Sequence, residues 1–87
     1  MSDWTVNYHR DLEKEIRRLP RQYIRRILEA IENLALNPYP PSSKKIQGHE
    51  LWRVSVGVYR ILYQIDEENQ VINTYRIGHR RGVYRSL

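Results

Sequence analysis

The sequence contains no cysteine, and this absence removes several classes of protein at once. Without cysteine the chain has no disulfide framework, no thiolate metal site and no cysteine nucleophile. Glycine is also scarce, and its four copies are scattered, so there is no glycine-rich phosphate-binding loop. No apolar run approaches the roughly 18 residues that a membrane-spanning helix needs, and the polar N-terminal stretch does not have the form of a signal peptide. We therefore expect a cytoplasmic protein without a membrane partner.

Common catalytic constellations are missing as well. The histidines at 9, 49 and 79 lie far apart, so no two of them have metal-ligand spacing. The acidic residues fall mainly in the expected helices and in the segment 66–68, and they give no convincing paired-carboxylate site. No serine lies in a nucleophile elbow. The sequence therefore predicts neither a metal nor a cofactor.

What the sequence does contain is a folded-domain composition, with 40% hydrophobic and 29% charged residues in 87 positions. This length allows one hydrophobic core, so we expect a single domain over 1–87. Fifteen lysines and arginines against ten acids give a net charge of +5, and most of these cations are arginines. Because guanidinium groups match phosphate geometry and stack on bases, the charge favours an anionic partner, either nucleic acid or an acidic protein.

The first half of the sequence predicts a strand followed by two helices. Alternation of large apolar and small polar residues over 4–8 indicates a short strand with one buried face. An apolar stripe over about 10–19 indicates the first helix, and Pro20 is expected in the first turn of the second. Apolar residues three or four apart extend the second helix to Ala35, and the proline-rich segment 37–43 ends it.

The second half has the two-residue period of β-strands. Alternation indicates strands at 51–56 and 59–66, with a tight turn between them and an acidic hairpin loop after the second. A further strand is expected at 70–77, followed by a basic tail, 78–87, that contains no acid. Helices followed by strands predict an α+β domain, with two N-terminal helices packed on one face of an antiparallel sheet of about four strands.

The polar face of this sheet and the tail carry cations together with an aromatic residue. The residues concerned are Lys44, Lys45, Arg53, Arg60, Arg80, Arg81 and Tyr84. Such a set suits phosphodiester chemistry, because arginines stabilise the charge that develops on a phosphorane and tyrosine stacks on a base or exchanges a proton. Such a set is poorly suited to proton transfer at neutral pH, since free tyrosine ionises at about pH 10 and arginine above about pH 12. An enzyme of this kind depends on shifted pKa values or on groups supplied by its substrate complex.

Each of these side chains also has an ordinary structural interpretation. Arg53 and Arg60 suit a solvated sheet surface as well as a phosphate site. His79 is either a general acid–base group or a surface histidine. The large aromatic residues Trp52 and Tyr63 favour the core over base stacking, and the arginines of the helices favour a solvated face. Composition and pattern alone leave these alternatives open.

Several short motifs in the second half occur in an order that is specific as a set. They are Lys45-Ile46-Gln47-Gly48, Leu51-Trp52-Arg53-Val54, Val58-Tyr59-Arg60-Ile61-Leu62-Tyr63, Arg76-Ile77-Gly78-His79-Arg80 and Val83-Tyr84. Together with the strand–helix–helix start, they resemble the RelE branch of the RelE/ParE toxin superfamily over nearly the whole chain. The resemblance implies a RelE-like fold, similar to microbial ribonucleases, and a toxin of a type II toxin–antitoxin system.

The resemblance also implies an activity and partners. RelE-like toxins are metal-independent endoribonucleases, or mRNA interferases, that enter the ribosomal A site, cut the mRNA there and so inhibit translation. A cognate RelB-like antitoxin, acidic or partly disordered, would neutralise the toxin, and a DNA operator would be bound only indirectly through their complex. Two alternatives remain: a ParE-type toxin that inhibits DNA gyrase, and a catalytically degenerate toxin that acts as co-repressor with its antitoxin.

Residue by residue, the resemblance assigns roles on the polar face. Arg60 matches the family arginine that stabilises the scissile phosphate, and Arg80 matches the arginine on the leaving-group side. Tyr84 matches the terminal tyrosine that stacks on or orients the mRNA base, and Arg53 falls where the family often has a catalytic lysine. ParE-like proteins generally lack the arginine–tyrosine set, which favours the ribonuclease. The residues expected to bind RNA are Lys44, Lys45, Arg81 and His79.

Two departures from the family pattern concern proton transfer. Ser55 stands where RelE itself has a second lysine, the favoured general base, and Gln47 stands where a further basic residue is common. Serine cannot replace an ammonium group, and Arg53 is a poorer proton acceptor than a lysine. The sequence therefore leaves the general base unassigned.

Overall fold

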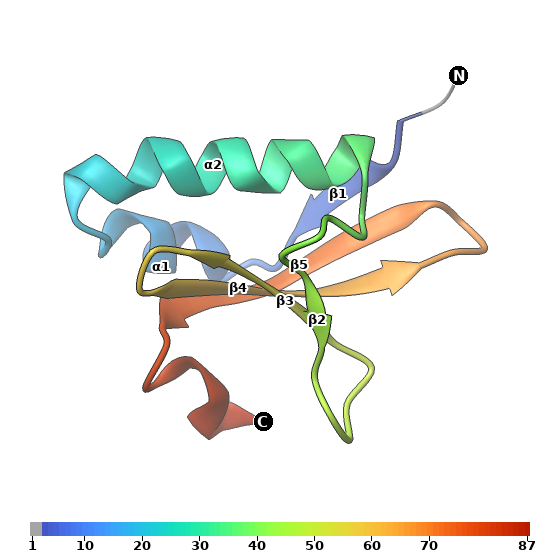
Figure 1. Ribbon diagram of the computed structural model, residues 1–87. Coiled ribbons are helices and arrows are strands. Elements are labelled where there is room, and N and C mark those ends of the chain that lie inside the picture. Colours follow the sequence, from blue (N-terminus) through green and yellow to red (C-terminus); the bar gives the residue numbers. More distant parts are fainter. Residues whose placement is uncertain (1–2) are drawn as a thin grey trace.

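The computed structural model describes residues 3–87, which form a five-stranded sheet with two helices on one face (Figure 1). The elements are β1 (Thr5–Tyr8), α1 (Leu12–Arg17), α2 (Arg21–Leu36), β2 (Lys44–Lys45), β3 (Trp52–Val56), β4 (Tyr59–Asp66), β5 (Val71–His79) and the 3₁₀-helix η1 (Val83–Ser86). This arrangement confirms the predicted α+β class. No helix among residues 3–87 is long and apolar enough to cross a bilayer.

The strand order β1-β5-β4-β3-β2 corrects two details of the prediction. The sheet has five strands rather than about four, because the two-residue strand β2 pairs with β3 and is too short to give an alternating pattern. The sheet is also not wholly antiparallel, since β1 runs parallel to β5 while the other neighbours are antiparallel. Parallel neighbours need a long connection between them, and everything from α1 to β4 lies between these two strands in the sequence.

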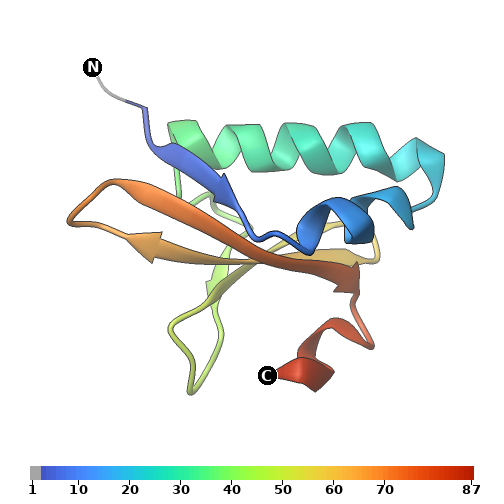
Figure 2. The same ribbon diagram turned by 180° about the vertical axis from the view of Figure 1, so that it is seen from behind.

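The main core lies between the helices and the sheet. Ile27, Ile31 and Leu34 recur at helical spacing along α2 and are almost fully buried. They belong to one buried cluster with Ile61 of β4 and Ile72 of β5. Seen from behind, α1 and α2 lie on the same side of the sheet (Figure 2). The alternation predicted for the strands is therefore correct for the face that meets the helices.

The first helix is shorter than the predicted span of about 10–19. Its hydrogen-bond pattern tightens at the end, where the Leu19 N–H bonds to the Ile16 carbonyl oxygen in a 3₁₀-type turn. Pro20 stands just before α2 as its N-cap, with φ −55° and ψ 137°, and not within the first turn. Because the ψ angle of Pro20 is extended and not helical, the helical hydrogen bonding stops there, and α1 and α2 are two separate helices.

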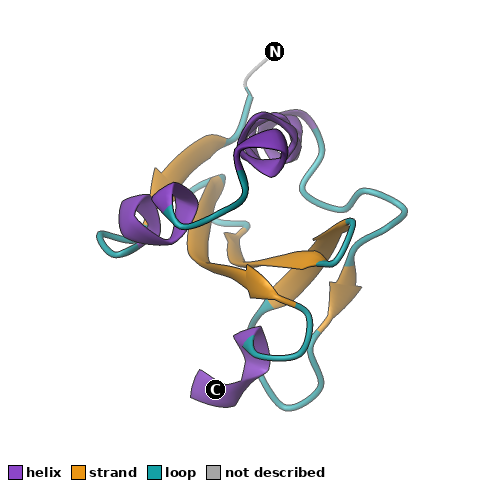
Figure 3. Cartoon of the chain, turned by 90° about the vertical axis from the view of Figure 1, so that its left-hand side faces the viewer, coloured by secondary structure: helices purple, strands orange, loops and turns teal. Residues whose placement is uncertain are grey.

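The face of the sheet turned away from α1 and α2 is here called the open face. The C-terminal helix η1 lies on this side (Figures 1 and 3). The sequence pattern extended the last strand only to Ile77 and gave the tail no structure. In the molecule β5 continues to His79, and η1 then packs on β5 through the buried side chain of Val83. This return of the tail places the last residues of the chain over the sheet.

Candidate active site

Five of the side chains selected from the sequence line one shallow cavity on the open face, which we call the arginine cavity. Its lining residues are Arg53, Arg60, Arg80, Arg81 and Tyr84, and its volume is about 490 Å³. They come from β3, from β4, from the segment after β5 and from η1. The structure thus brings together all four residues expected to be catalytic and one of the residues expected to bind RNA.

The strand register explains how Arg53 and Arg60 reach the same cavity. Arg53 lies opposite Leu62 in the β3–β4 ladder, and Arg60 lies opposite Ser55. Directly opposite residues in an antiparallel pair point to the same face, so both arginines project from the open face. Leu62 is completely buried and lies outside the main core cluster. It therefore lies in the ladder between the two arginines, covered from solvent on the side of the open face.

Tyr84 is positioned by a close contact between β5 and η1. Gly78 lies opposite Arg60 in the β4–β5 ladder and presents only a hydrogen atom to the open face. Val83 packs on it so closely that a Cβ on Gly78 would lie 3.2 Å from the Val83 Cβ. Because Tyr84 follows Val83 directly, this contact holds the tyrosine at the rim of the arginine cavity. The sequence motif contained both residues, but their pairing depends on the chain folding back.

The segment between β5 and η1 holds its two arginines through backbone hydrogen bonds. The Arg80 N–H donates to the Val58 carbonyl oxygen at 2.8 Å, which extends the β4–β5 pairing by one residue. The Arg81 N–H donates to Nδ1 of His79 at 3.2 Å. The His79 ring also meets the edge of the Tyr59 ring, with the centroids 6.0 Å apart. His79 shapes this segment and does not line the arginine cavity, so its contact with RNA stays a prediction.

The arginine cavity is strongly cationic. Among the residues that the structure describes, none of its four arginines forms an ion pair with a carboxylate, and no acidic residue lines the cavity. Arg60 folds back onto the β3–β4 turn, where its Nη1 donates to the carbonyl oxygens of Gly57 and Tyr59 at 3.0 Å each. These bonds fix the guanidinium group and neutralise none of its charge. Such a cavity is suited to bind an anion, above all a phosphate.

The two lysines of β2 point in different directions. Lys44 lies opposite Arg53 and therefore faces the same side of the sheet. Lys45 lies opposite Trp52, and its Nζ is 3.9 Å from a carboxylate oxygen of Glu50. Lys44 is thus a neighbour of the arginine cavity, whereas Lys45 is turned away from it. A role for either in binding RNA remains a prediction.

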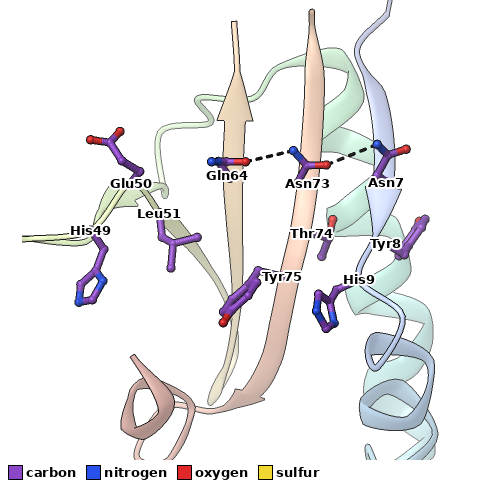
Figure 4. A pocket seen from close by; sticks show the side chains of 10 residues that line it. All are labelled: Asn7, Tyr8, His9, His49, Glu50, Leu51, Gln64, Asn73, Thr74 and Tyr75. Carbon is purple, nitrogen blue, oxygen red and sulfur yellow. Dashed lines mark hydrogen bonds between the residues drawn. The ribbon is translucent and has the colours of Figure 1, made fainter.

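A second cavity on the open face contains residues that the sequence analysis did not select. It lies at the other end of the sheet, and amide and aromatic side chains line it (Figure 4). Asn7 and Asn73 meet there although they are 66 positions apart in the sequence. No local motif could reveal this cavity, because only the pairing of β1 with β5 assembles it. Among residues 3–87, no three histidine, aspartate or glutamate side chains gather in a way that could hold a metal ion.

Comparison with known proteins places this geometry in context. The sequence matches the family described as "ParE toxin of type II toxin-antitoxin system, parDE" over residues 3–84. The putative toxin RelE1 of Methanocaldococcus jannaschii is 29% identical over 87 residues, which cover 95% of this chain and 97% of that protein.

Two solved structures show the same fold. In the RelE–RelB complex of Pyrococcus horikoshii, the matching chain has a TM-score of 0.81 and 26% identity, covering 93% of this chain and 99% of that one. In the RelB–RelE antitoxin–toxin complex of Methanococcus jannaschii, the TM-score is 0.75 and the identity 25%, with coverage of 93% and 98%.

Proposed function

The chain belongs to the family of ParE toxins of type II toxin–antitoxin systems, in the RelE-like branch of the RelE/ParE superfamily, and we propose that it is a ribosome-dependent endoribonuclease. Its substrate is the mRNA in the ribosomal A site, and its action stops translation. The observation that carries this proposal is the arginine cavity, where Arg53, Arg60, Arg80 and Tyr84 converge without any carboxylate.

The cavity suits cleavage of RNA by its own 2′-hydroxyl group. In this reaction the 2′-oxygen forms a bond to phosphorus, the bond from phosphorus to the 5′-oxygen breaks, and the products are a 2′,3′-cyclic phosphate and a free 5′-hydroxyl. The 2′-hydroxyl proton leaves to a base, and the 5′-oxygen gains a proton. The phosphorane between these steps carries extra negative charge. Arg60, whose guanidinium group is held by the carbonyl oxygens of Gly57 and Tyr59, and Arg80, which lines the same cavity, stabilise that charge.

The composition of the cavity supports the proposal that cleavage depends on the ribosome. Its lining contains neither an imidazole nor a carboxylate, which are the groups that most often transfer protons near neutral pH. Free RNA is also flexible, and in-line attack requires a defined strand geometry. The ribosome would fix the codon in that geometry and supply polar groups around it. Tyr84 would stack on the exposed base and orient it.

The partner that controls this toxin is, we infer, a RelB-like antitoxin. The structures that resemble this chain include an antitoxin–toxin complex. Four arginines without carboxylate partners repel one another, and acidic side chains of an antitoxin would relieve that repulsion. A partly disordered antitoxin could cover a large area with a short chain. A DNA operator would be bound through the antitoxin and not by the toxin itself.

The proposed activity is tested by primer extension on an mRNA, with and without ribosomes, using toxin released from its antitoxin. We expect cleavage at the A-site codon only when ribosomes translate the message. Equal cleavage of free RNA would contradict the ribosome dependence, and no cleavage by folded toxin in either case would contradict the nuclease. The family that the sequence matches is described as a ParE toxin. The same preparation is therefore also assayed for inhibition of gyrase supercoiling. Inhibition there would assign the toxin to the gyrase-directed class.

A further inference from the structure

The second cavity on the open face, which we call the amide groove, has a chemistry quite different from the arginine cavity. Its volume is about 560 Å³. The lining residues are Asn7, Tyr8, His9, His49, Glu50, Leu51, Gln64, Asn73, Thr74 and Tyr75. Glu50 is the only aspartate, glutamate, lysine or arginine among them. Its Oε1 lies 3.9 Å from Nζ of Lys45. The groove therefore has no lysine or arginine in its lining to bind a phosphate.

Three side-chain amides form a ladder across the floor of the amide groove. The Asn7 Nδ2 donates to the Asn73 Oδ1 at 3.4 Å, and the Asn73 Nδ2 donates to the Gln64 Oε1 at 3.1 Å. The three residues stand side by side on β1, β5 and β4 (Figure 4). The ladder orders the amides and leaves hydrogen-bond capacity at both of its ends, a donor on Gln64 Nε2 and an acceptor on Asn7 Oδ1. Such groups recognise the edge of a nucleobase.

Aromatic rings stand beside this ladder. Tyr8 and Tyr75 are both exposed, with 50% and 36% of their surface accessible. The His9 ring meets the Tyr75 ring edge-on, with the centroids 5.6 Å apart, and the two lie next to each other in Figure 4. Exposed rings of this kind provide stacking surfaces for unpaired bases. Hydrogen-bonding amides and exposed aromatic rings are thus present in one groove.

A β-bulge directs Tyr75 toward the amide groove. In the β4–β5 ladder, Tyr63 pairs with Thr74 but Leu62 pairs with Arg76, so Tyr75 is an extra residue on β5. Bulges of this type change the direction of a side chain and are frequent beside functional sites. The guanidinium carbon of Arg76 lies 5.8 Å from the centre of the Tyr75 ring. This contact supports the ring from one side.

The amide groove and the arginine cavity belong to one continuous face of the sheet. Gln64 follows Arg60 by four positions on β4, which places the two residues roughly 13 Å apart on the same side. One RNA strand can therefore put a phosphate among the arginines and a nearby base into the amide groove. We propose that the amide groove binds an unpaired base of the RNA strand whose phosphate lies in the arginine cavity. This inference rests on the proposed function and adds a site of base recognition to it.

The test uses the whole protein and an RNA that it cannot cleave. A 2′-O-methyl hexa-adenylate is titrated into ¹⁵N-labelled toxin, because adenine offers an edge that side-chain amides recognise. The control is an oligomer with the same phosphates but no bases. We expect the side-chain amide signals of Asn7, Gln64 and Asn73 to shift only with the first oligomer. The guanidinium signals of Arg53 and Arg60 should shift with both.

Two variants supply the energetic test. Tyr75→Ala should weaken binding of the hexa-adenylate roughly 5- to 150-fold, which is the usual loss for one stacked base, and should leave binding of the baseless oligomer unchanged. Gln64→Ala, at an exposed position, should weaken only the hexa-adenylate and serves if Tyr75→Ala does not fold. The matched control is Tyr39→Ala, which removes a tyrosine of similar exposure, 41%, outside the amide groove. It should bind both oligomers as the natural protein does.

The outcomes separate this inference from the nuclease proposal. If the side-chain amide signals do not shift, or shift equally with the baseless oligomer, the inference that the groove binds a base is wrong, even if ribosomal cleavage is observed. Amide signals that shift only with the hexa-adenylate would support the groove even if cleavage is never found. If Tyr75→Ala leaves RNA binding unchanged but weakens binding of the antitoxin, the groove docks a protein and the inference is wrong.

Discussion

Val83 occupies the space that a side chain on Gly78 would need, since a Cβ at position 78 would lie 3.2 Å from both the Cβ and the Cγ2 of Val83. The backbone of Gly78 has no positive φ, so the requirement for glycine comes from this contact and not from backbone strain. Gly78 lies opposite Arg60, and Tyr84 follows Val83. One close contact thus couples the strand that carries an arginine to the helix that carries the tyrosine.

Gly78→Ala should therefore affect activity more than folding. The added methyl group must push η1 outward by a few tenths of an ångström, which costs about 1–3 kcal/mol as for other overpacked sites and moves Tyr84 away from the arginines. We expect a slower single-turnover cleavage on programmed ribosomes, with the decrease in stability measured by urea unfolding. Gly82→Ala is the matched control, because a Cβ at position 82 has no atom within 4 Å. A Gly78→Ala protein with natural activity would contradict the positioning role.

Arg60 should contribute to catalysis and not to folding. Removing one preorganised donor to a developing charge typically slows a reaction about 10²–10³-fold. We expect Arg60→Ala to remain folded, to bind antitoxin and to cleave A-site mRNA at least about 100-fold more slowly. Arg81→Ala, one position beyond the residue that matches the family, should lose much less, and Arg25→Ala on the exposed side of α2 should lose nothing.

The measurement is single-turnover cleavage, with circular dichroism to show that each variant is folded. A folded Arg60→Ala protein that cuts at the natural rate would remove this arginine from the mechanism. An unfolded variant would show that Arg60 contributes mainly through its bonds to the turn at Gly57.

Prediction from sequence succeeded where a pattern was local and repeated. The strand over 59–66 has the predicted bounds, and the second helix ends within one residue of the predicted end, because each carries several periods of apolar residues. The two-residue strand β2 and the helix η1 were missed, because neither is long enough to show a period. The parallel pairing of β1 with β5 was missed because it joins distant parts of the chain.

The residues of the candidate site were also predicted only in part from the sequence. Alternation along the strands placed Arg53 and Arg60 on the polar face, and the family resemblance added Arg80 and Tyr84, which share their cavity in the structure. The placement of His79 away from that cavity could not be foreseen, because it depends on how far β5 extends. The amide groove could not be foreseen either, since its residues come from three strands and two loops. Sequence patterns predict well which face of the sheet a residue occupies. They predict less well which residues come together on that face.

Lys44 and Arg53 form a cross-strand pair of like charges, and this pair should cost stability in the free toxin. Directly opposed charges of one sign are unfavourable by about 0.2–1 kcal/mol. Lys44→Ala should raise the free energy of unfolding by a few tenths of a kcal/mol at low salt. This gain in stability should disappear at about 1 M salt, where screening is strong. The same variant should bind RNA more weakly.

Lys45→Ala is the control for this pair, because it removes a lysine from the same strand that faces Glu50 instead. It should not stabilise the protein. A double-mutant cycle with Arg53→Ala measures the coupling directly by urea unfolding. A coupling of zero would show that the two side chains avoid each other in solution, and the argument for mutual repulsion would fail.

Tyr63 links the sheet to the loop after α2, and it should make stability depend on alkaline pH. Its buried hydroxyl donates to the Pro38 carbonyl oxygen at 2.9 Å, and burial raises the pKa of Tyr63 above its ordinary value of about 10. Above that pH the unfolded chain loses the Tyr63 proton while the folded protein keeps it. Unfolding then releases a proton, so the free energy of unfolding must fall as the pH rises toward the folded-state pKa.

Tyr63→Phe removes this effect together with the hydrogen bond. We expect the variant to lose about 1–3 kcal/mol at neutral pH, because the buried Pro38 carbonyl group is left without its donor. Its stability should then fall less steeply than that of the natural protein above about pH 10. Tyr39, whose pKa is raised to about 12 mainly by its hydrogen bond to the Glu67 carboxylate, is retained in the variant, and the charge of Tyr63 is the smallest of the causes that raise it. Urea unfolding from pH 7 to 11 provides the measurement. Parallel curves for the two proteins would show that Tyr63 ionises as readily in the folded protein as in the unfolded chain.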